Sequence, residues 1–379
     1  MTPVLPGSTI GILGSGQLGR MLALAARPLG YRIHVYAPDA DGAPASQVAD
    51  TVTSADYLNE AALDAFAADC DVITIEFENI PARTLERLAA VTRVHPGARA
   101  LHITQNRLRE KNFLVGNGLP LARFAHVRNM IELEAAAADI GLPAVLKTAG
   151  FGYDGKGQLL LEDHGQLAGA EALLAEGDAV LEGFVDFERE VSIIAARSSN
   201  GETGSYGLFS NRHADHILDV TTAGGQAENQ AVHSQALLIA ERIMAGLDYV
   251  GVLCVELFQQ ADGSLLVNEI APRVHNSGHL TIEASRSSQF QQHIRAICGL
   301  PLGDFGTQAA AMANLLGDEW SGGEPDWAAA LADPRVQLHL YGKAGARAGR
   351  KMGHLTAVAA SEGEAEAAVK GARRALRSG

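Results

Sequence analysis

Cysteine is scarce in this sequence of 379 residues: only Cys70, Cys254 and Cys298 occur, without a CxxC pair or a cysteine–histidine cluster. This scarcity excludes a disulfide framework and a cysteine-rich zinc site. Long hydrophobic runs are also missing, because no stretch approaches the roughly 18 apolar residues that cross a bilayer. The N-terminus has neither a basic start nor the apolar core of a signal peptide. We therefore expect a cytoplasmic protein that has no membrane partner.

Basic residues are also in short supply. Lysine and arginine number 30 against 44 aspartates and glutamates, which gives a formal net charge of −14. A field of that sign repels phosphate backbones, so we expect no nucleic-acid partner. A small anionic substrate is still compatible with this charge, because a pocket can gather cations and backbone N–H groups. Hydrophobic residues make up 47% of the chain, as in folded proteins, and the length suggests two or three domains.

Strands and helices alternate through the first hundred residues. This order is typical of a doubly wound parallel sheet, and we place it in an N-terminal Rossmann-like domain at 1–105. Expected strands lie at 9–13, 31–36 and 72–75, and expected helices at 17–29 and 59–68.

The rest of the chain is richer in strands. It predicts an α+β domain with antiparallel sheets at 106–304 and a small α+β domain at 305–379. Expected strands lie at 144–147, 157–161, 179–182, 188–196, 205–210, 216–221, 251–258, 264–270, 336–341 and 352–358, and expected helices at 106–116, 129–140, 163–175, 229–246, 287–298 and from about 362.

Gly14, Gly16 and Gly19 form a GxGxxG run between the first expected strand and the first expected helix. Glycines at this spacing let the backbone approach a phosphate, whose charge the helix N-terminus favours. Asp39, about 20 residues further on, mimics the acidic residue of a dinucleotide site. The pattern favours a phosphate or nucleotide site, and a tight turn that binds nothing is the alternative.

A second glycine-dense run, GFGYDGKGQ at 150–158, follows an expected strand. Its amides and Lys156 can fold over a polyphosphate, while Lys147 on the strand supplies a fixed cation. The run is not a Walker loop, because it contains no GK[ST]. We interpret it as a phosphate-binding loop, with a flexible hairpin that carries a surface lysine as the alternative.

Two glutamates face each other across an expected hairpin. Asp262-Gly263 is a two-residue turn signal, and a turn centred on that pair sets Glu256 directly opposite Glu269. Their Cβ atoms would lie ~5 Å apart on one face. Such like charges need a proton or a shared cation, and Mg²⁺ takes one or two carboxylates together with substrate phosphates. We predict a metal site here, with a solvated edge pair as the alternative.

Polar side chains crowd the segment that follows Glu269. Arg273 can hold a carboxylate or bicarbonate with two hydrogen bonds, and His275 and Asn276 are further donors. This density is too high for ordinary turn chemistry, so we interpret the segment as part of an active site.

Glu182 and Glu190 flank a short apolar stretch that contains Phe184, Val185 and Phe187. Such a stretch can hold an adenine through backbone hydrogen bonds, while a glutamate accepts from ribose hydroxyls. Taken alone, the pattern favours solvated glutamates at a strand end.

Together these runs resemble the ATP-grasp superfamily and, within it, the family of 5-(carboxyamino)imidazole ribonucleotide synthases. The likeness covers nearly the whole chain, and PRVHNSGH together with GQLGRM distinguishes this family from other ATP-grasp ligases. The matching runs are GSGQLGRM at 14–21, TIEFENI at 74–80, GFGYDGKGQ at 150–158, FEREVS at 187–192, DYVGVLCVE at 248–256, NEIAPRVHNSGH at 268–279, YGK at 341–343 and GRKMGHL at 349–355.

The resemblance implies a homodimer with a central ATP-grasp clamp. It implies that bicarbonate attacks ATP to form carboxyphosphate and ADP. The carboxyphosphate would then deliver its carboxyl group, directly or as CO₂, to the amine of aminoimidazole ribonucleotide and leave phosphate. The glycine run at Gly14 would then contact the amine substrate, and Asp39 would lose its ribose role. Lys343 and Arg350 would hold the 5′-phosphate of the ribonucleotide.

The same resemblance assigns site residues in four groups. ATP would be bound by Arg107, Lys147, Gly152, Tyr153, Asp154, Gly155, Lys156, Gly157, Gln158, Glu182, Gly183, Phe184, Val185, Glu190, His213, Asn268 and Glu269. The other substrates would be bound by Gly16, Gln17, Leu18, Glu76, Tyr153, Asp154, Arg273, His275, Asn276, Ser277, Lys343 and Arg350. Mg²⁺, or Mn²⁺ in its place, would be bound by Glu256 and Glu269. The catalytic residues would be Lys147, Asp154, Arg273, His275 and Asn276.

Three other functions stay open at this point. The first is another ATP-grasp ligase, such as a formate-dependent glycinamide ribonucleotide transformylase. The second is an NAD(P)-dependent oxidoreductase built on the glycine run and Asp39, which would leave the Glu256/Glu269 pair unexplained. The third is a binding module without turnover.

Overall fold

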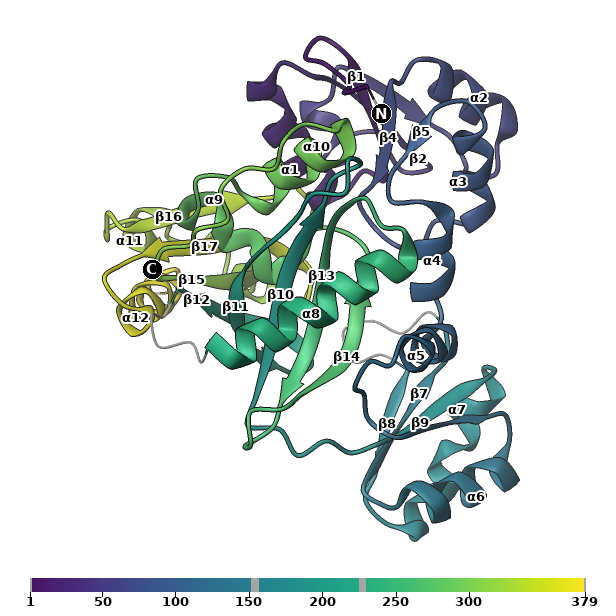
Figure 1. The fold of residues 1–379 in the computed structure, drawn as a ribbon. Helices are drawn as coiled ribbons and strands as arrows, with labels where there is room; N and C mark the ends of the chain where they lie inside the picture. The colour runs from purple at the N-terminus through teal and green to yellow at the C-terminus, as the bar shows by residue number, and fades with distance from the viewer. Residues whose placement is uncertain (1, 151–156, 225–229, 378–379) are drawn as a thin grey trace.

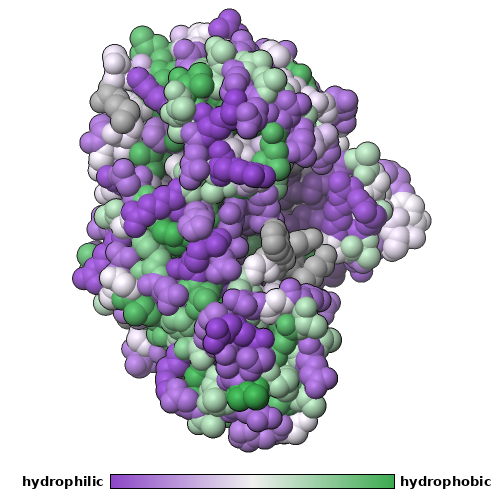
Figure 2. All heavy atoms as spheres, turned by 90° about the vertical axis from the view of Figure 1, so that its right-hand side faces the viewer, coloured by the Kyte–Doolittle hydropathy of each residue, from purple (hydrophilic) through white to green (hydrophobic). Residues whose placement is uncertain are grey.

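The chain folds around three β-sheets (Figure 1). The computed structural model describes residues 2–150, 157–224 and 230–377. Hydrophilic residues interspersed with hydrophobic ones cover the face drawn in Figure 2. Among the described residues, no helix combines the length and apolar character that a bilayer span requires.

The N-terminal sheet is parallel throughout, with the strand order β3-β2-β1-β4-β5. All five residues of β1 are buried, as expected for a parallel strand covered on both faces. The predicted Rossmann-like sheet is thus confirmed. Its strands are β1 (Thr9–Leu13), β2 (Arg32–Ala37), β3 (Thr51–Ser54), β4 (Val72–Ile75) and β5 (Arg93–Val94), and its helices are α1 (Gln17–Ala26), α2 (Glu60–Ala68), α3 (Ala82–Ala89) and α4 (Ala98–Thr104).

A separate lobe holds a four-stranded antiparallel sheet in the order β6-β9-β7-β8 (Figure 1). The helix expected at 163–175 is a 3₁₀ helix (His164–Ala170) that continues into the short α7. The elements of this lobe are β6 (Phe124–Val127), α6 (Met130–Ile140), β7 (Ala144–Thr148), β8 (Gln158–Leu161), α7 (Glu171–Ala175) and β9 (Ala179–Gly183), and α5 (Arg107–Gly116) precedes them in the chain.

The third sheet has eight strands in the order β14-β13-β10-β11-β12-β15-β17-β16. The strands after residue 305 continue it, so the domain boundaries at 105/106 and 304/305 stay a proposal. Its strands are β10 (Arg189–Arg197), β11 (Thr203–Ala214), β12 (Ile217–Ala223), β13 (Gly251–Gln259), β14 (Leu265–Ala271), β15 (Ala310–Leu316), β16 (Val336–Leu340) and β17 (Lys351–Val358), and the associated helices are α8 (Gln230–Leu247), α9 (Thr281–Ala284), α10 (Gln289–Cys298), α11 (Trp327–Ala330) and α12 (Glu362–Ala375).

Helix α8 covers one face of this sheet because its apolar residues recur at helical spacing. Val232, Ala236, Ile239, Ala240 and Ile243 are buried and join the core beneath β10, β13 and β14. On the other side, α10 packs against α1 and ties the large sheet to the N-terminal one. The large sheet therefore serves as the platform between the two other sheets.

The turn between β13 and β14 differs from the expected one. Gln260 and Ser264 close a three-residue loop, in which Gly263 has a φ of 84°. This geometry is the common three-residue hairpin with a left-handed glycine, and it moves the register by one residue. A bulge at Asn268 moves it back, so Glu256 still pairs with Glu269. The predicted two-residue turn is wrong, whereas the predicted pairing is confirmed.

Candidate active site

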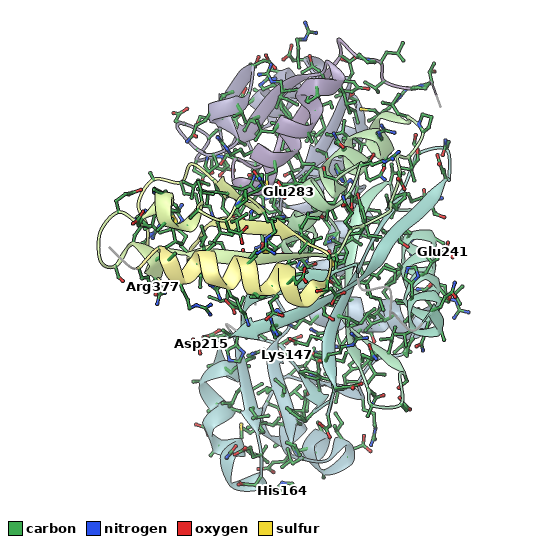
Figure 3. All side chains as sticks on the ribbon, turned by 90° about the vertical axis from the view of Figure 1, so that its left-hand side faces the viewer. Lys147, His164, Asp215, Glu241, Glu283 and Arg377 are labelled. Carbon is green, nitrogen blue, oxygen red and sulfur yellow. The ribbon has the colours of Figure 1, made fainter. Side chains whose placement is uncertain are left out.

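A cavity of about 930 Å³ lies where the three sheets meet. The carboxyl ends of β1 and β4 supply Gln17 and Glu76 to its wall, and the separate lobe supplies Lys147 and Glu182. Figure 3 shows Lys147 near the junction of that lobe with the rest of the molecule. Residues from all parts of the chain thus face one space.

Glu256 and Glu269 line this cavity from neighbouring strands. Oε1 of Glu256 lies 2.9 Å from Nε2 of His275, and Oε2 of Glu269 lies 3.5 Å from Nη1 of Arg107. Asn268, the bulge residue, lines the same wall. Carboxylate oxygens are ligands that Mg²⁺ prefers, so these two residues could hold such an ion. Within the described ranges, no group of three or more histidine, cysteine, aspartate or glutamate side chains is arranged to hold a metal ion.

Glu256 and His275 stabilise each other's charged forms. Burial favours the neutral acid, but the hydrogen bond and charge of His275 prevail and lower the pKa of Glu256 to about 2. Burial likewise disfavours the imidazolium, but the Cys254 sulfur and Glu256 raise the pKa of His275 to about 10. Nδ1 of His275 lies 2.9 Å from Oγ of Ser277, which fixes the ring.

Asn276 is 8% exposed and lines the cavity. Within the part of the chain that the structure describes, neither its Oδ1 nor its Nδ2 has a hydrogen-bond partner. A buried amide without partners is costly, so its presence on a cavity wall points to a ligand that would satisfy it.

Arg273 is held by Glu78 through two hydrogen bonds, of which that from Nη2 to Oε1 is 2.9 Å long. Burial favours loss of the guanidinium proton, but the charge of Glu78 prevails and raises the pKa of Arg273. Glu78 was not among the predicted site residues. It orients the plane of the guanidinium on the cavity wall.

Glu182 lies between two lysines. Its Oε2 is 3.0 Å from Nζ of Lys111 and 3.2 Å from Nζ of Lys147. Burial would raise the pKa of Glu182, but the charges of Lys147 and Lys111 prevail and lower it. Because Glu182 is 4% exposed, the solvated strand-end glutamate that the pattern alone favours is wrong for this residue.

Aromatic and polar groups share the neighbouring wall. Phe187 stacks on Phe258 with ring centroids 4.8 Å apart, and Phe184 lines the cavity beside them. Nδ1 of His213 lies 2.5 Å from Oε2 of Glu190. A flat apolar surface next to a carboxylate suits a base with its ribose.

The glycine run at the start of α1 encloses a carboxylate of this chain. Glu76 accepts hydrogen bonds from the backbone amides of Gly16 and Gly19, the latter 2.7 Å long. A Cβ at Gly14 would lie 2.2 Å from Cγ of Glu76. Oδ1 of Asp39 accepts from Ser15 at 3.1 Å. The helix terminus that a dinucleotide phosphate would use is thus occupied by Glu76.

Lys343 enters the cavity from the loop before β17 and donates to Oε1 of Gln17 and, at 2.6 Å, to the carbonyl of Lys351. Burial and the charge of Arg350 lower the pKa of Lys343 to about 8. Arg350 itself donates to the carbonyls of Ala344 and Gly345. Lys351, which the predicted set lacks, lines the wall beside Lys343.

Most of the predicted site residues that the structure describes meet at this cavity, but three do not line it. Gly157, Ser277 and Arg350 lie off its wall, and residues 152–156 fall outside the described ranges. Sequence reasoning also missed the buried Glu110 and Lys111 on α5. Burial and the charge of Glu269 raise the pKa of Glu110 to about 8. No local signal marks them, because their partners Ile270 and Glu182 lie far away in the sequence.

Family models match three consecutive parts of the chain. They are described as the ribonucleotide synthetase preATP-grasp domain at 7–105, the ATP-grasp domain at 112–290 and the phosphoribosylaminoimidazole carboxylase C-terminal domain at 310–368.

Relatives of known sequence match over almost the full length. The N5-carboxyaminoimidazole ribonucleotide synthase of Brucella melitensis is 46% identical over 360 residues, which cover 94% of this chain and 98% of that protein. The synthase of the same name from Bacillus subtilis is 41% identical over 362 residues, which cover 95% of this chain and 94% of that protein.

Solved structures match equally well. An N5-carboxyaminoimidazole ribonucleotide synthetase in complex with ADP superposes with a TM-score of 0.92 at 40% identity and 98% coverage of both chains. The Aspergillus clavatus synthase, solved with ADP and 5-aminoimidazole ribonucleotide, gives a TM-score of 0.88 at 31% identity and covers 97% of this chain and 98% of that one. The chain therefore belongs to the N5-carboxyaminoimidazole ribonucleotide synthase family of ATP-grasp ligases.

Proposed function

We propose that this chain carboxylates 5-aminoimidazole ribonucleotide with bicarbonate at the expense of ATP, in purine (IMP) biosynthesis. The products are 5-carboxyaminoimidazole ribonucleotide, ADP and phosphate. The observation that carries the proposal is the pairing of Glu256 with Glu269 on the wall of one cavity that also holds Lys147 and Lys343. The relatives named N5-carboxyaminoimidazole ribonucleotide synthase support it, as does the Aspergillus synthase solved with ADP and the ribonucleotide.

ATP would lie between the separate lobe and the large sheet. Phe184, Phe187 and Phe258 would contact the adenine, and Glu190 would accept from the ribose. Lys147 and Arg107 would neutralise the phosphates. The remaining members of the proposed ATP set are His213, Glu182, Gly183, Val185, Asn268, Glu269, Gln158 and the loop 152–157.

Glu256 and Glu269 would hold Mg²⁺ or Mn²⁺, which fits the two opposed carboxylates on the cavity wall. When bound, the ion would offset the charge of the nucleotide phosphates. The pair His275–Glu256 and the pair Arg273–Glu78 would remain beside it as fixed charges.

The chemistry proceeds in two steps. A bicarbonate oxygen attacks the γ-phosphorus, the bond to the ADP oxygen breaks, and carboxyphosphate forms. The exocyclic amine then bonds to the carboxyl carbon, the carbon–oxygen bond to phosphate breaks, and the amine loses a proton. Arg273, His275 and the unpartnered amide of Asn276 would hold bicarbonate and the labile anhydride.

Glu76, Gln17 and Lys343 would bind the ribonucleotide, with Lys343 at its 5′-phosphate. Arg350, whose Nη1 donates to the carbonyls of Ala344 and Gly345, would join it there. We also propose that the enzyme works as a homodimer in the cytoplasm, as the family resemblance implies.

The deciding experiment measures ADP release with each substrate omitted in turn. We expect release to require bicarbonate and aminoimidazole ribonucleotide together. Release with formate and glycinamide ribonucleotide instead, or a nicotinamide absorbance change without ADP, would overturn the proposal. Binding of ATP and the ribonucleotide without any phosphate release would identify a binding module.

A further inference from the structure

Helix α5 connects the two structures that would enclose ATP (Figure 1). The backbone amide of Arg107 donates to the carbonyl of Ala149, next to β7, at 2.7 Å. Nζ of Lys111 lies 3.0 Å from Glu182 on β9. One turn of this helix therefore contacts the separate lobe at two points.

The same turn also contacts the strand that carries Glu269. Oε1 of Glu110 accepts a hydrogen bond of 2.6 Å from the backbone amide of Ile270, the residue directly after Glu269. Arg107, three residues earlier on the helix, reaches Oε2 of Glu269 at 3.5 Å. The helix thus contacts β14 at two points, the backbone amide of Ile270 and the side chain of Glu269.

The position of β14 explains why this amide needs a partner. It is the edge strand of the large sheet, so its outward amides have no neighbouring strand. The amide of Val267 donates to the carbonyl of Pro120 at 2.8 Å, and that of Ile270 donates to Glu110. Both Glu110, at 3% exposure, and Ile270, at 5%, are shielded from water that could replace the bond.

We propose that Glu110 is a positioning residue for the carboxylate pair: by accepting from the Ile270 amide, it fixes the end of β14 and the direction of the Glu269 side chain. The proposal rests on the proposed metal–nucleotide role of Glu256 and Glu269. It assigns Glu110 the part of a hydrogen-bond acceptor, in which its negative charge is dispensable.

Two substitutions separate these properties. Glu110→Gln keeps an acceptor oxygen and removes the charge, whereas Glu110→Ala removes both. Arg109→Ala changes the neighbouring, exposed position of the same helix and is the control. Thermal melting first verifies that each variant folds. If Glu110→Ala does not fold, it is replaced by Glu110→Asp, which shortens the side chain by one carbon.

The first measurement needs neither metal nor substrate. Hydrogen–deuterium exchange at the Ile270 amide should accelerate at least tenfold in Glu110→Ala relative to the wild type, and by less than threefold in Glu110→Gln and Arg109→Ala. Unchanged exchange in Glu110→Ala would show that Glu110 does not fix the end of β14 and would overturn the proposal, whatever reaction the enzyme catalyses.

The second measurement uses calorimetry to determine the Mn²⁺ concentration at which ADP binding is half-saturated. We expect it to rise at least tenfold in Glu110→Ala and less than threefold in Glu110→Gln, while the KM for the ribonucleotide changes little. Equal losses in both variants would assign the effect to the charge of Glu110 and refute the positioning role. If the enzyme carboxylates none of the substrates tested, the proposed function fails. The Mn²⁺ measurement still decides whether Glu110 acts as a hydrogen-bond acceptor or through its charge.

Discussion

The carboxylate of Glu76 occupies the turn formed by Gly14, Gly16 and Gly19, where it accepts from two backbone amides at the start of α1. Burial raises the pKa of Glu76, although the two amides act in the opposite direction. The glycines are needed here because a Cβ at Gly14 would overlap Cγ of Glu76. This turn thus presents a fixed carboxyl group to the cavity, in place of a bound phosphate.

Gly14→Ala should therefore displace Glu76. We expect it to lower the free energy of unfolding by about 1–3 kcal/mol and to raise the KM for the ribonucleotide at least tenfold. Gly7→Ala is the matched control, because Gly7 also has a positive φ of 95° but no atom within 4 Å of an added Cβ. Urea unfolding and steady-state kinetics check both variants. Equal effects of the two substitutions would mean that backbone strain alone is responsible.

The opposed carboxylates give a second prediction. Glu269→Gln should lower the kcat for ADP release at least a hundredfold, because an amide is a poor metal ligand. The variant should still fold, because Gln and Glu have a similar size. Glu188→Gln, at an exposed position on the way into β10, should keep wild-type turnover. Wild-type turnover of Glu269→Gln at saturating Mg²⁺ would contradict the ligand assignment.

The Glu256/Glu269 pairing was predictable because hairpin register depends on a short segment. The predicted turn type was wrong by one residue, and the bulge at Asn268 compensated for that error. A bulge has no reliable signature in one sequence, so the sequence could not reveal this compensation.

Other parts of the site depend on contacts that no local pattern encodes. The glycine run at Gly14 predicts a close approach of something to the backbone, but the sequence cannot say whether that is a phosphate or Glu76, 62 positions away. Glu110 and Lys111 resemble residues of an ordinary charged helix face. Their burial follows only from the packing of α5 against β14 and β9. The parallel sheet was easier to predict, because it follows from the order of local elements.

The ribonucleotide end of the cavity gives a prediction on pH. Burial and the charge of Arg350 lower the pKa of Lys343 to about 8, so the ammonium that would bind the phosphate loses its proton above that pH. The pH dependence of kcat/KM reports the pKa values of essential groups in the free enzyme. The kcat/KM for the ribonucleotide should therefore fall up to tenfold per pH unit above about pH 8. The value for ATP at saturating ribonucleotide should not follow this decline.

Lys343→Arg is the control for that profile, because a guanidinium keeps its charge throughout this range. We expect its kcat/KM for the ribonucleotide to be lower than that of the wild type but flat between pH 7 and about pH 10. The same decline in Lys343→Arg would assign the titration to another group.

Asn276 allows stability to be separated from function. Its buried amide lacks partners within the described residues, and relieving such a group is worth about 1–3 kcal/mol. Asn276→Leu should therefore melt at or above the wild-type temperature and yet lose ADP release. Asn211→Leu is the matched control: Asn211 is also buried, but it donates to Ser192 and accepts from Thr221, both at 3.0 Å. That substitution removes both hydrogen bonds, although Ser192 keeps its contact with Oγ of Ser277 at 2.9 Å, and it should lower the melting temperature. If Asn276→Leu instead melted at as low a temperature as Asn211→Leu, the Asn276 amide would have a partner within the protein, and the argument that it binds a ligand would fail.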